Sequence, residues 1–296
     1  MVRKGITYAR NLLWLLPALV LLVVFVYYPI VDNVRLSFYS WSAFNPVPKF
    51  VGLDNYNQAI HDPVFWTALR NNVFYAVVSV VVQVGFGLVL AALVEEFVAP
   101  KLKGFFRSVY FLPATLSITV AGMLFTFLYH PQFGLVDDTL RAVGLDHWAI
   151  DWLGSQGFAI WSIILMSQWQ ATGYVMVLFI VAIQRIPREL YESSELDGAG
   201  RVKTFFNITV PLVREMTGLM TIVTISGAFL VFNEVQVMTD GGPDNSSQVL
   251  GTWLYKSAFF NDQMGYGATL ATVIFLLTFV AALIQLAYTR KKRVEF

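Results

Sequence analysis

The sequence contains no cysteine and few charged residues. Without cysteine, disulfides, thiolate metal sites and cysteine nucleophiles are excluded. Only 13% of the 296 residues are charged and 57% are hydrophobic, whereas an average soluble domain is about 25% charged. The net charge of +1 gives no overall field that would attract nucleic acid. A soluble fold of this length needs more polar surface than the sequence supplies, so the composition indicates an integral membrane protein.

Motifs for catalysis and metal binding are also missing. The sequence has no His-Glu-x-x-His motif and no Gly-x-x-x-x-Gly-Lys-Ser/Thr phosphate loop, so it cannot hydrolyse ATP by the usual route. Its three histidines are scattered, and none has a second ligand at helical spacing. We therefore expect a chain that is not an enzyme and that has no catalytic residue, metal site or cofactor site of its own.

The sequence contains several long apolar segments. A helix needs about 20 mostly apolar residues to cross the hydrocarbon core of a bilayer. Six segments reach or approach this length: residues 12–30, 73–94, 109–129, 158–183, 218–238 and 268–288. The sequence therefore predicts an all-α, polytopic membrane protein in which residues 1–296 form a single domain of about six transmembrane helices.

The basic residues divide unequally between the two sides of the membrane. Of the 20 Lys and Arg residues, 15 lie at the two termini or in the second-to-third and fourth-to-fifth connections, and 5 lie in the other connections. Cytoplasmic loops carry the excess of Lys and Arg. We therefore expect both termini to be cytoplasmic, together with loop 184–214 between the fourth and fifth spans.

Polar residues gather in the fourth and fifth spans. The fourth contains Ser167, Gln168, Gln170, Thr172 and Tyr174, and the fifth contains Thr221, Thr224, Ser226, Asn233, Glu234 and Gln236. Such groups cannot face lipid without losing hydrogen bonds. They either bond between helices or line a passage for a hydroxyl-rich solute, and the sequence leaves both interpretations open. Glu234 is likewise either a functional carboxylate at membrane depth or a shallow one that reaches interfacial water.

Loop 184–214 is unlike the other connections. Pro187 suits the first turn of a helix. Three glutamates then recur on one face of that helix, at Glu189, Glu192 and Glu195. Gly198 and Gly200 end the helix and allow a sharp turn. A second amphipathic helix follows, with an apolar side formed by Phe205, Ile208 and Leu212. This shape fits either a docking element for a partner's groove or an ordinary surface hairpin.

The same loop resembles the EAA loop of the permease subunits of bacterial ABC importers. That pattern runs Glu-Ala-Ala, then Asp-Gly-Ala, then an aromatic residue, an isoleucine and a proline. The matching residues are Glu192, Asp197, Gly198, Ala199, Phe205, Ile208 and Pro211. Ser193 and Ser194 stand where the pattern has two alanines. Further segments are similar to the carbohydrate branch of the family, around the maltose and glycerol-3-phosphate importers: residues 111–113, 133–135, 169–174, 186–187, 239–243 and 255–267.

The resemblance implies a MetI-like permease core in the bacterial inner membrane. It implies as partners a second permease subunit, a dimer of ATPase subunits that binds ATP and Mg, and an extracytoplasmic solute-binding protein. The residues expected to couple to the ATPase are Glu192, Ser193, Ser194, Asp197, Gly198, Ala199 and Gly200. The residues expected to line the solute passage are Gln170, Tyr174, Ser226 and Asn233.

A secondary transporter of a polar solute is the alternative from another class. It would need an internal repeat and intramembrane carboxylates for ion coupling, and Glu234 alone is thin support for it. The sequence does not give the solute. A mono-, di- or oligosaccharide, a polyol and glycerol-3-phosphate all remain open.

Overall fold

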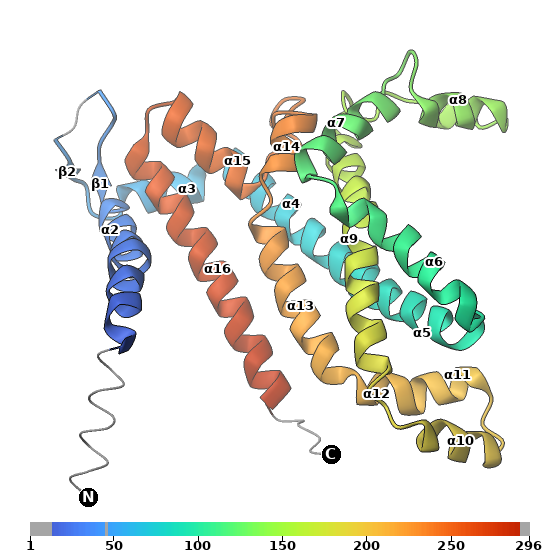
Figure 1. Ribbon diagram of the computed structural model, residues 1–296. Coiled ribbons are helices and arrows are strands. Elements are labelled where there is room, and N and C mark those ends of the chain that lie inside the picture. Colours follow the sequence, from blue (N-terminus) through green and yellow to red (C-terminus); the bar gives the residue numbers. More distant parts are fainter. Residues whose placement is uncertain (1–13, 45–46, 291–296) are drawn as a thin grey trace, which may run out of the picture. The chain divides into compact units, whose positions relative to one another are not determined.

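The computed structural model describes residues 14–44 and 47–290 (Figure 1). The chain is 76% helical, which confirms the predicted all-α class. In the described ranges the sheet structure is a single two-stranded hairpin of β1 (Tyr39–Ser40) and β2 (Lys49–Phe50). Contacts divide the chain into two compact units. Unit 1 comprises Met1–Asp62 and Leu254–Val273, and unit 2 comprises Pro63–Trp253 and Ile274–Phe296. The single domain expected over residues 1–296 stays a prediction.

Unit 1 is held together by side-chain amides that bond to backbone carbonyls. Its helices are Trp14–Leu36, which includes η1 (Val23–Tyr27) and α2 (Tyr28–Leu36), then α3 (Asp54–His61), η6 (Lys256–Phe260) and the first part of α16 (Met264–Arg290). The Asn33 amide of α2 donates to the Ala268 carbonyl of α16 at 3.2 Å. The buried Asn55 amide of α3 donates to the carbonyls of Ser37 and Tyr39. These bonds fix both α3 and α16 to the end of α2.

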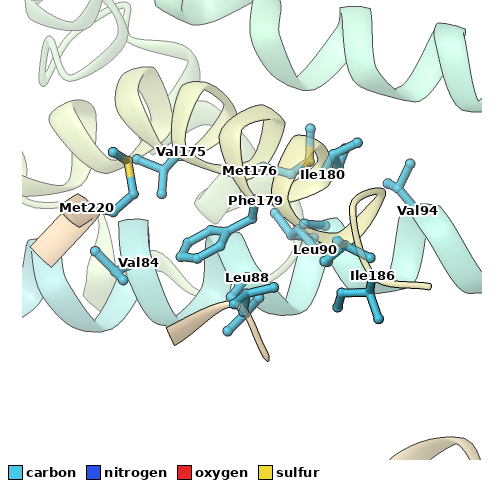
Figure 2. Close-up of a cluster of buried hydrophobic side chains, with 13 residues drawn as sticks. Val84, Leu88, Leu90, Val94, Val175, Met176, Phe179, Ile180, Ile186 and Met220 are labelled. Carbon is cyan, nitrogen blue, oxygen red and sulfur yellow. The ribbon is translucent and has the colours of Figure 1, made fainter. Parts of the chain in front are cut away.

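Unit 2 is built around two long helices. One is a continuous 35-residue helix made of α4 (Pro63–Ser79), η2 (Val80–Phe86) and α5 (Gly87–Phe97). The other is α9 (Ala159–Ile183), which packs along η2 and α5. Phe179 of α9 is fully buried at the centre of their contact, against Val84 and Leu88, with Met220 also in the cluster (Figure 2). The predicted spans 73–94 and 158–183 lie on these two helices.

In the residues that the structure describes, unit 2 has twelve further helical elements besides the second part of α16. They are α6 (Pro100–Phe111), η3 (Leu112–Thr115), α7 (Ile118–Leu128), α8 (Leu135–Ala142), η4 (Asp146–Trp148), α10 (Arg188–Leu196), α11 (Arg201–Thr204), η5 (Phe205–Thr209), α12 (Val210–Leu212), α13 (Arg214–Phe229), α14 (Asn233–Met238) and α15 (Leu250–Tyr255), of which the last continues into unit 1. Figure 1 shows α10 to α12 at one end of unit 2, and α7, α8 and α14 at the other.

Two of the predicted spans are not single helices. The third, 109–129, is interrupted: α6 and η3 end at Thr115, and α7 leaves at an angle of 94° to them. The fifth, 218–238, is also wrong as one helix, because α13 ends at Phe229 and α14 begins at Asn233. In the described residues, four helices are long and apolar enough to cross a membrane, or up to six if each bent pair counts as one span. The upper value equals the predicted six in number, but its second bent pair joins Arg201–Leu212 to Arg214–Phe229 and not the two parts of 218–238.

Close packing of α9 on α6 leads to a stability prediction. A β-carbon at Gly173 of α9 would overlap the backbone carbonyl of Tyr110 on α6. Gly173→Ala should therefore force the two helices apart, at a cost of about 1–3 kcal/mol, and lower the midpoint of thermal unfolding in detergent. Gly104→Ala is the control, because an added β-carbon there meets nothing within 4 Å. Equal midpoints for the two variants would contradict this close approach.

Candidate functional site

The segment that carries the strongest sequence signal forms a helical hairpin at one end of unit 2 (Figure 1). We call residues 188–212 the hairpin; its first arm is α10 and its second arm runs through α11, η5 and α12. Pro187 is the N-cap of α10, with extended ψ of 132°, and not part of its first turn as predicted. The expected helix, turn and helix are all present.

The turn of the hairpin depends on one glycine. Gly198 has a φ of +74°, a conformation that glycine adopts without steric cost. The Ala199 N–H donates to the Ser194 carbonyl and the Gly198 N–H donates to the Glu195 carbonyl, each at 3.0 Å. These two bonds are the Schellman arrangement that closes a helix C-terminus. The chain then turns sharply, and Gly200 becomes the N-cap of α11.

Two hydroxyl contacts join the arms of the hairpin. The hydroxyl oxygens of Ser194 and Thr204 lie 2.8 Å apart, and those of Tyr191 and Thr209 lie 3.1 Å apart. Ser194 is buried, and partial burial raises the pKa of the Tyr191 hydroxyl. The departure from the EAA pattern at Ser194 therefore has a structural role, because an alanine there has no hydroxyl to bond to Thr204.

The two faces of the hairpin differ in polarity. Phe205, Ile208 and Leu212 are half-buried against the core cluster between α5 and α9, as the apolar spacing predicted. The opposite surface combines exposed acids with exposed apolar side chains. Glu192, Ser193, Glu195 and Asp197 are exposed, as are Leu196 (90%), Val202 (73%) and Phe206 (62%). Such an apolar tip, rimmed by carboxylates, is the kind of surface that a protein partner covers.

A cavity of about 600 Å³ lies between the hairpin and α5 and α6. Its lining includes Glu95, Glu96, Lys103, Glu192, Glu195 and Arg201. Both arms of the hairpin line this cavity, the first with Tyr191, Glu192 and Glu195 and the second with Arg201, Thr204 and Thr209.

Glu95 and Glu96, at the end of α5, are residues that the sequence analysis missed. Glu95 forms ion pairs with Lys103, at 3.1 Å, and with Arg107. Glu96 forms an ion pair with Arg201 of the hairpin at 3.4 Å. The available signal was two adjacent carboxylates at the end of an apolar span, followed by a basic connection. That signal does not identify Arg201, which lies about a hundred residues away.

The four residues expected to line the passage lie on three helices. Gln170 and Tyr174 are one turn apart on α9, Ser226 is on α13 and Asn233 is the first residue of α14. Both α13 and α14 pack against α9. Gln170 is buried and its amide donates to the Leu116 carbonyl at 2.9 Å. Tyr174 and Asn233 are exposed, and Ser226 is half-buried. Their shared role in a passage stays a prediction.

Comparison with known proteins supplies the class of protein. Residues 83–294 match the family described as "Binding-protein-dependent transport system inner membrane component". The chain belongs to this family. It is 50% identical over 283 residues to the "Probable ABC transporter permease protein YurN" of Bacillus subtilis (strain 168), which covers 96% of this chain and 97% of the relative. It is 34% identical to the "Lactose transport system permease protein LacF" of Rhizobium radiobacter, over 95% of this chain and 94% of the relative.

Solved structures share the fold of this permease. A chain from a crystal structure of a bacterial ABC transporter involved in the import of the acidic polysaccharide alginate has a TM-score of 0.82. It is 20% identical and covers 98% of this chain and 96% of its own length. The expected permease fold is therefore confirmed. As an ABC transporter permease the chain is not an enzyme, since the ATPase activity of such transporters lies in a separate subunit.

Polar side chains of α4 contact both sides of the permease's second helix break, which lies between α13 and α14. The buried Asn72 donates to the Ala228 carbonyl at 2.6 Å and accepts a bond from the Leu250 N–H at 2.8 Å. The Tyr75 hydroxyl donates to the Glu234 carboxylate at 2.8 Å. Glu234 is thus buried and paired, which does not support the interpretation that it reaches interfacial water. Of its neighbours in the fifth span, Thr221 donates to the Thr217 carbonyl of its own helix and Gln236 donates to the nearby Asp240 carboxylate, so the two interpretations of these polar residues stay open.

The glycines of the hairpin turn provide a test of its geometry. Gly198→Ala should strain the turn by about 1–2 kcal/mol, because an L-residue is disfavoured at positive φ. Gly200→Ala should be tolerated, since its φ of −68° suits any residue and neither position has an atom within 4 Å of an added β-carbon. Hydrogen exchange of residues 188–212 should be roughly tenfold faster only in Gly198→Ala. Equal exchange in both variants would show that the turn is not held at this φ.

Proposed function

We propose that this permease is one of two membrane subunits of an ATP-driven importer for a sugar or sugar-like solute. The observation that carries the proposal is the set of near-full-length relatives. Besides the lactose permease, they include the "Probable starch degradation products transport system permease protein AmyD", at 30% identity and 99% coverage of this chain, and the "Arabinooligosaccharides transport system permease protein AraP" of Halalkalibacterium halodurans, at 30% and 92%. Full-length similarity to several sugar permeases supports a sugar here.

The hairpin is the element through which the permease would engage a cytoplasmic ATPase dimer. At its exposed tip, Leu196 follows Glu192 by one helical turn, and both side chains are exposed. An apolar side chain beside a carboxylate suits insertion into a partly apolar groove that carries a basic residue. Residues Glu192 to Gly200 would form the contact. ATP and Mg would be bound by the ATPase subunits. The excess of basic residues supports a cytoplasmic position for the hairpin and for both termini.

The solute would pass between this permease and a second permease subunit, after delivery by an extracytoplasmic binding protein. The exposed side chains of Tyr174 and Asn233 suit contact with hydroxyl-rich rings, since a tyrosine ring stacks on their apolar faces and an amide both donates and accepts. Ser226 and Gln170 would add to the same passage. Gln170 keeps its carbonyl oxygen and its second amide N–H for a solute, because the bond to the Leu116 carbonyl uses one N–H of its amide.

Reconstitution of the complete complex tests the proposed function. The permease, purified with its partners in proteoliposomes, should take up labelled sugar only with ATP and the binding protein. Leu196→Asp should abolish co-purification of the ATPase, because a charge replaces an apolar side chain that is 90% exposed at the tip. Val143→Asp is the control, at a 65% exposed apolar site beside α8, and should retain the ATPase. Uptake driven by a proton or sodium gradient without ATP would overturn the importer assignment.

Alanine variants separate passage contacts from structural ones. Asn233→Ala should lower uptake and substrate-stimulated ATPase activity several-fold while the thermal midpoint stays unchanged, because Asn233 is exposed. Gln170→Ala should lower the midpoint as well, since loss of one partner of a buried hydrogen bond costs about 1–3 kcal/mol. If both variants kept wild-type uptake, neither residue would belong to the passage.

A further inference from the structure

Two adjacent carboxylates at the end of α5 bind two different parts of the chain. Successive residues of an α-helix point about 100° apart, so Glu95 and Glu96 face different neighbours. Glu95 faces α6 and the end of α9, and Glu96 faces the start of α11. One rigid helix end therefore connects elements that are otherwise separated by the cavity beneath the hairpin.

The Glu95 contacts brace α6 against α5 and α9. The Lys103 ammonium lies 3.1 Å from the Glu95 carboxylate and 2.5 Å from its backbone carbonyl. Arg107, one turn further along α6, donates to the other carboxylate oxygen, and the Gln184 amide approaches the same oxygen at 3.4 Å. The side chains of Glu95, Lys103 and Arg107 are 16–32% exposed. Charge-assisted bonds in such a half-buried network are stronger than isolated surface pairs.

The Glu96 contact reaches the hairpin. Arg201 is the first residue of α11, directly after the glycine turn. Its guanidinium lies 3.4 Å from the Glu96 carboxylate and 4.5 Å from the centroid of the Phe97 ring. In the part of the chain that the structure describes, this is the ion pair that joins the hairpin to α5. A cation on an aromatic face adds to the pair, so Arg201 is held by two neighbouring residues of α5.

We propose that Glu95 and Glu96 form a bracket of positioning residues that transmits movement of the hairpin to α6. This inference rests on the proposed function. The ion pairs of Glu95 and Glu96 lie along the cavity between the hairpin and α6. Arg201 pulls on the end of α5 through Glu96, and α6 follows through Lys103 and Arg107. The opposite end of α6 continues through η3 into the 94° bend before α7, where Gln170 of α9 holds the Leu116 carbonyl. A small shift of α6 therefore acts on the bend.

The bracket is specific to the proposed movement and not only to folding. The second arm of the hairpin is already anchored by Phe205, Ile208 and Leu212, so loss of the Glu96–Arg201 pair leaves the hairpin in place. It removes the ion pair that joins the start of the second arm, directly after the turn, to α5. The bracket thus predicts lost coupling between ATP hydrolysis and uptake, with assembly and stability retained.

Charge exchange in the reconstituted complex tests this. Glu96→Arg and Arg201→Glu should each lower sugar uptake per ATP hydrolysed about fivefold. The double variant, with the two charges exchanged, should recover most of the loss. Asp138→Arg breaks a comparable exposed pair, with Arg141 at 3.5 Å on α8, and should leave the ratio unchanged. The near-isosteric Glu96→Gln, which preserves the fold, should give a smaller loss of the same kind.

The outcomes separate the bracket from the proposed function. Absence of ATP-dependent uptake in the wild-type complex would overturn the importer assignment itself. Wild-type uptake together with normal coupling in both Glu96→Arg and Glu96→Gln would overturn the bracket alone. A double variant no better than the single ones would also count against the bracket, because direct pairing of residues 96 and 201 is its central claim.

Discussion

In a chain this apolar, each polar group that a broken helix frees must find a partner inside the protein, because lipid offers none. Two helix breaks of unit 2, before α7 and before α14, obey this constraint. At the first break, before α7, the Gln170 amide donates a hydrogen bond to the Leu116 carbonyl. At the second break, before α14, the Asn72 amide donates a hydrogen bond to the Ala228 carbonyl. The polar residues of α4 and α9 are therefore the condition that allows α7 and α14 to leave their parent helices, and α7 and α14 then pack against each other.

Sequence reasoning located the apolar segments well and their interruptions poorly. A hydropathy window averages over 20 or so residues and so cannot see a bend that keeps the apolar character. For the first break a signal existed, since Pro113 lies in the 3-10 turn that precedes it and proline cannot donate to a helix. The second break has no such signal: the residues between α13 and α14 are Leu230, Val231 and Phe232. What holds that break is Asn72, on a helix more than 150 residues earlier.

The same distinction applies to the hairpin. Its turn could be predicted from the local sequence, because the backbone there has a positive φ and glycine adopts such a φ without steric cost, whatever its neighbours. Its apolar face follows from helical spacing. The contacts between its arms required the structure: Ser194 reads as a small residue in the sequence, yet its hydroxyl bonds Thr204. The ion pair between Glu96 and Arg201 also depends on tertiary placement, since either charge is compatible with many partners.

The hairpin is attached asymmetrically, and this determines how it can move. Apolar packing at Phe205, Ile208 and Leu212 is non-directional and short-ranged, so the second arm tolerates rotation about its axis but little separation. The first arm contributes Tyr191 to the same cluster, and both arms line a cavity of about 600 Å³. An element anchored mainly along one arm suits hinged movement about that arm. The contact of Arg201 with Glu96 and Phe97 lies beside the turn, where the proposed movement would be transferred to the long helix.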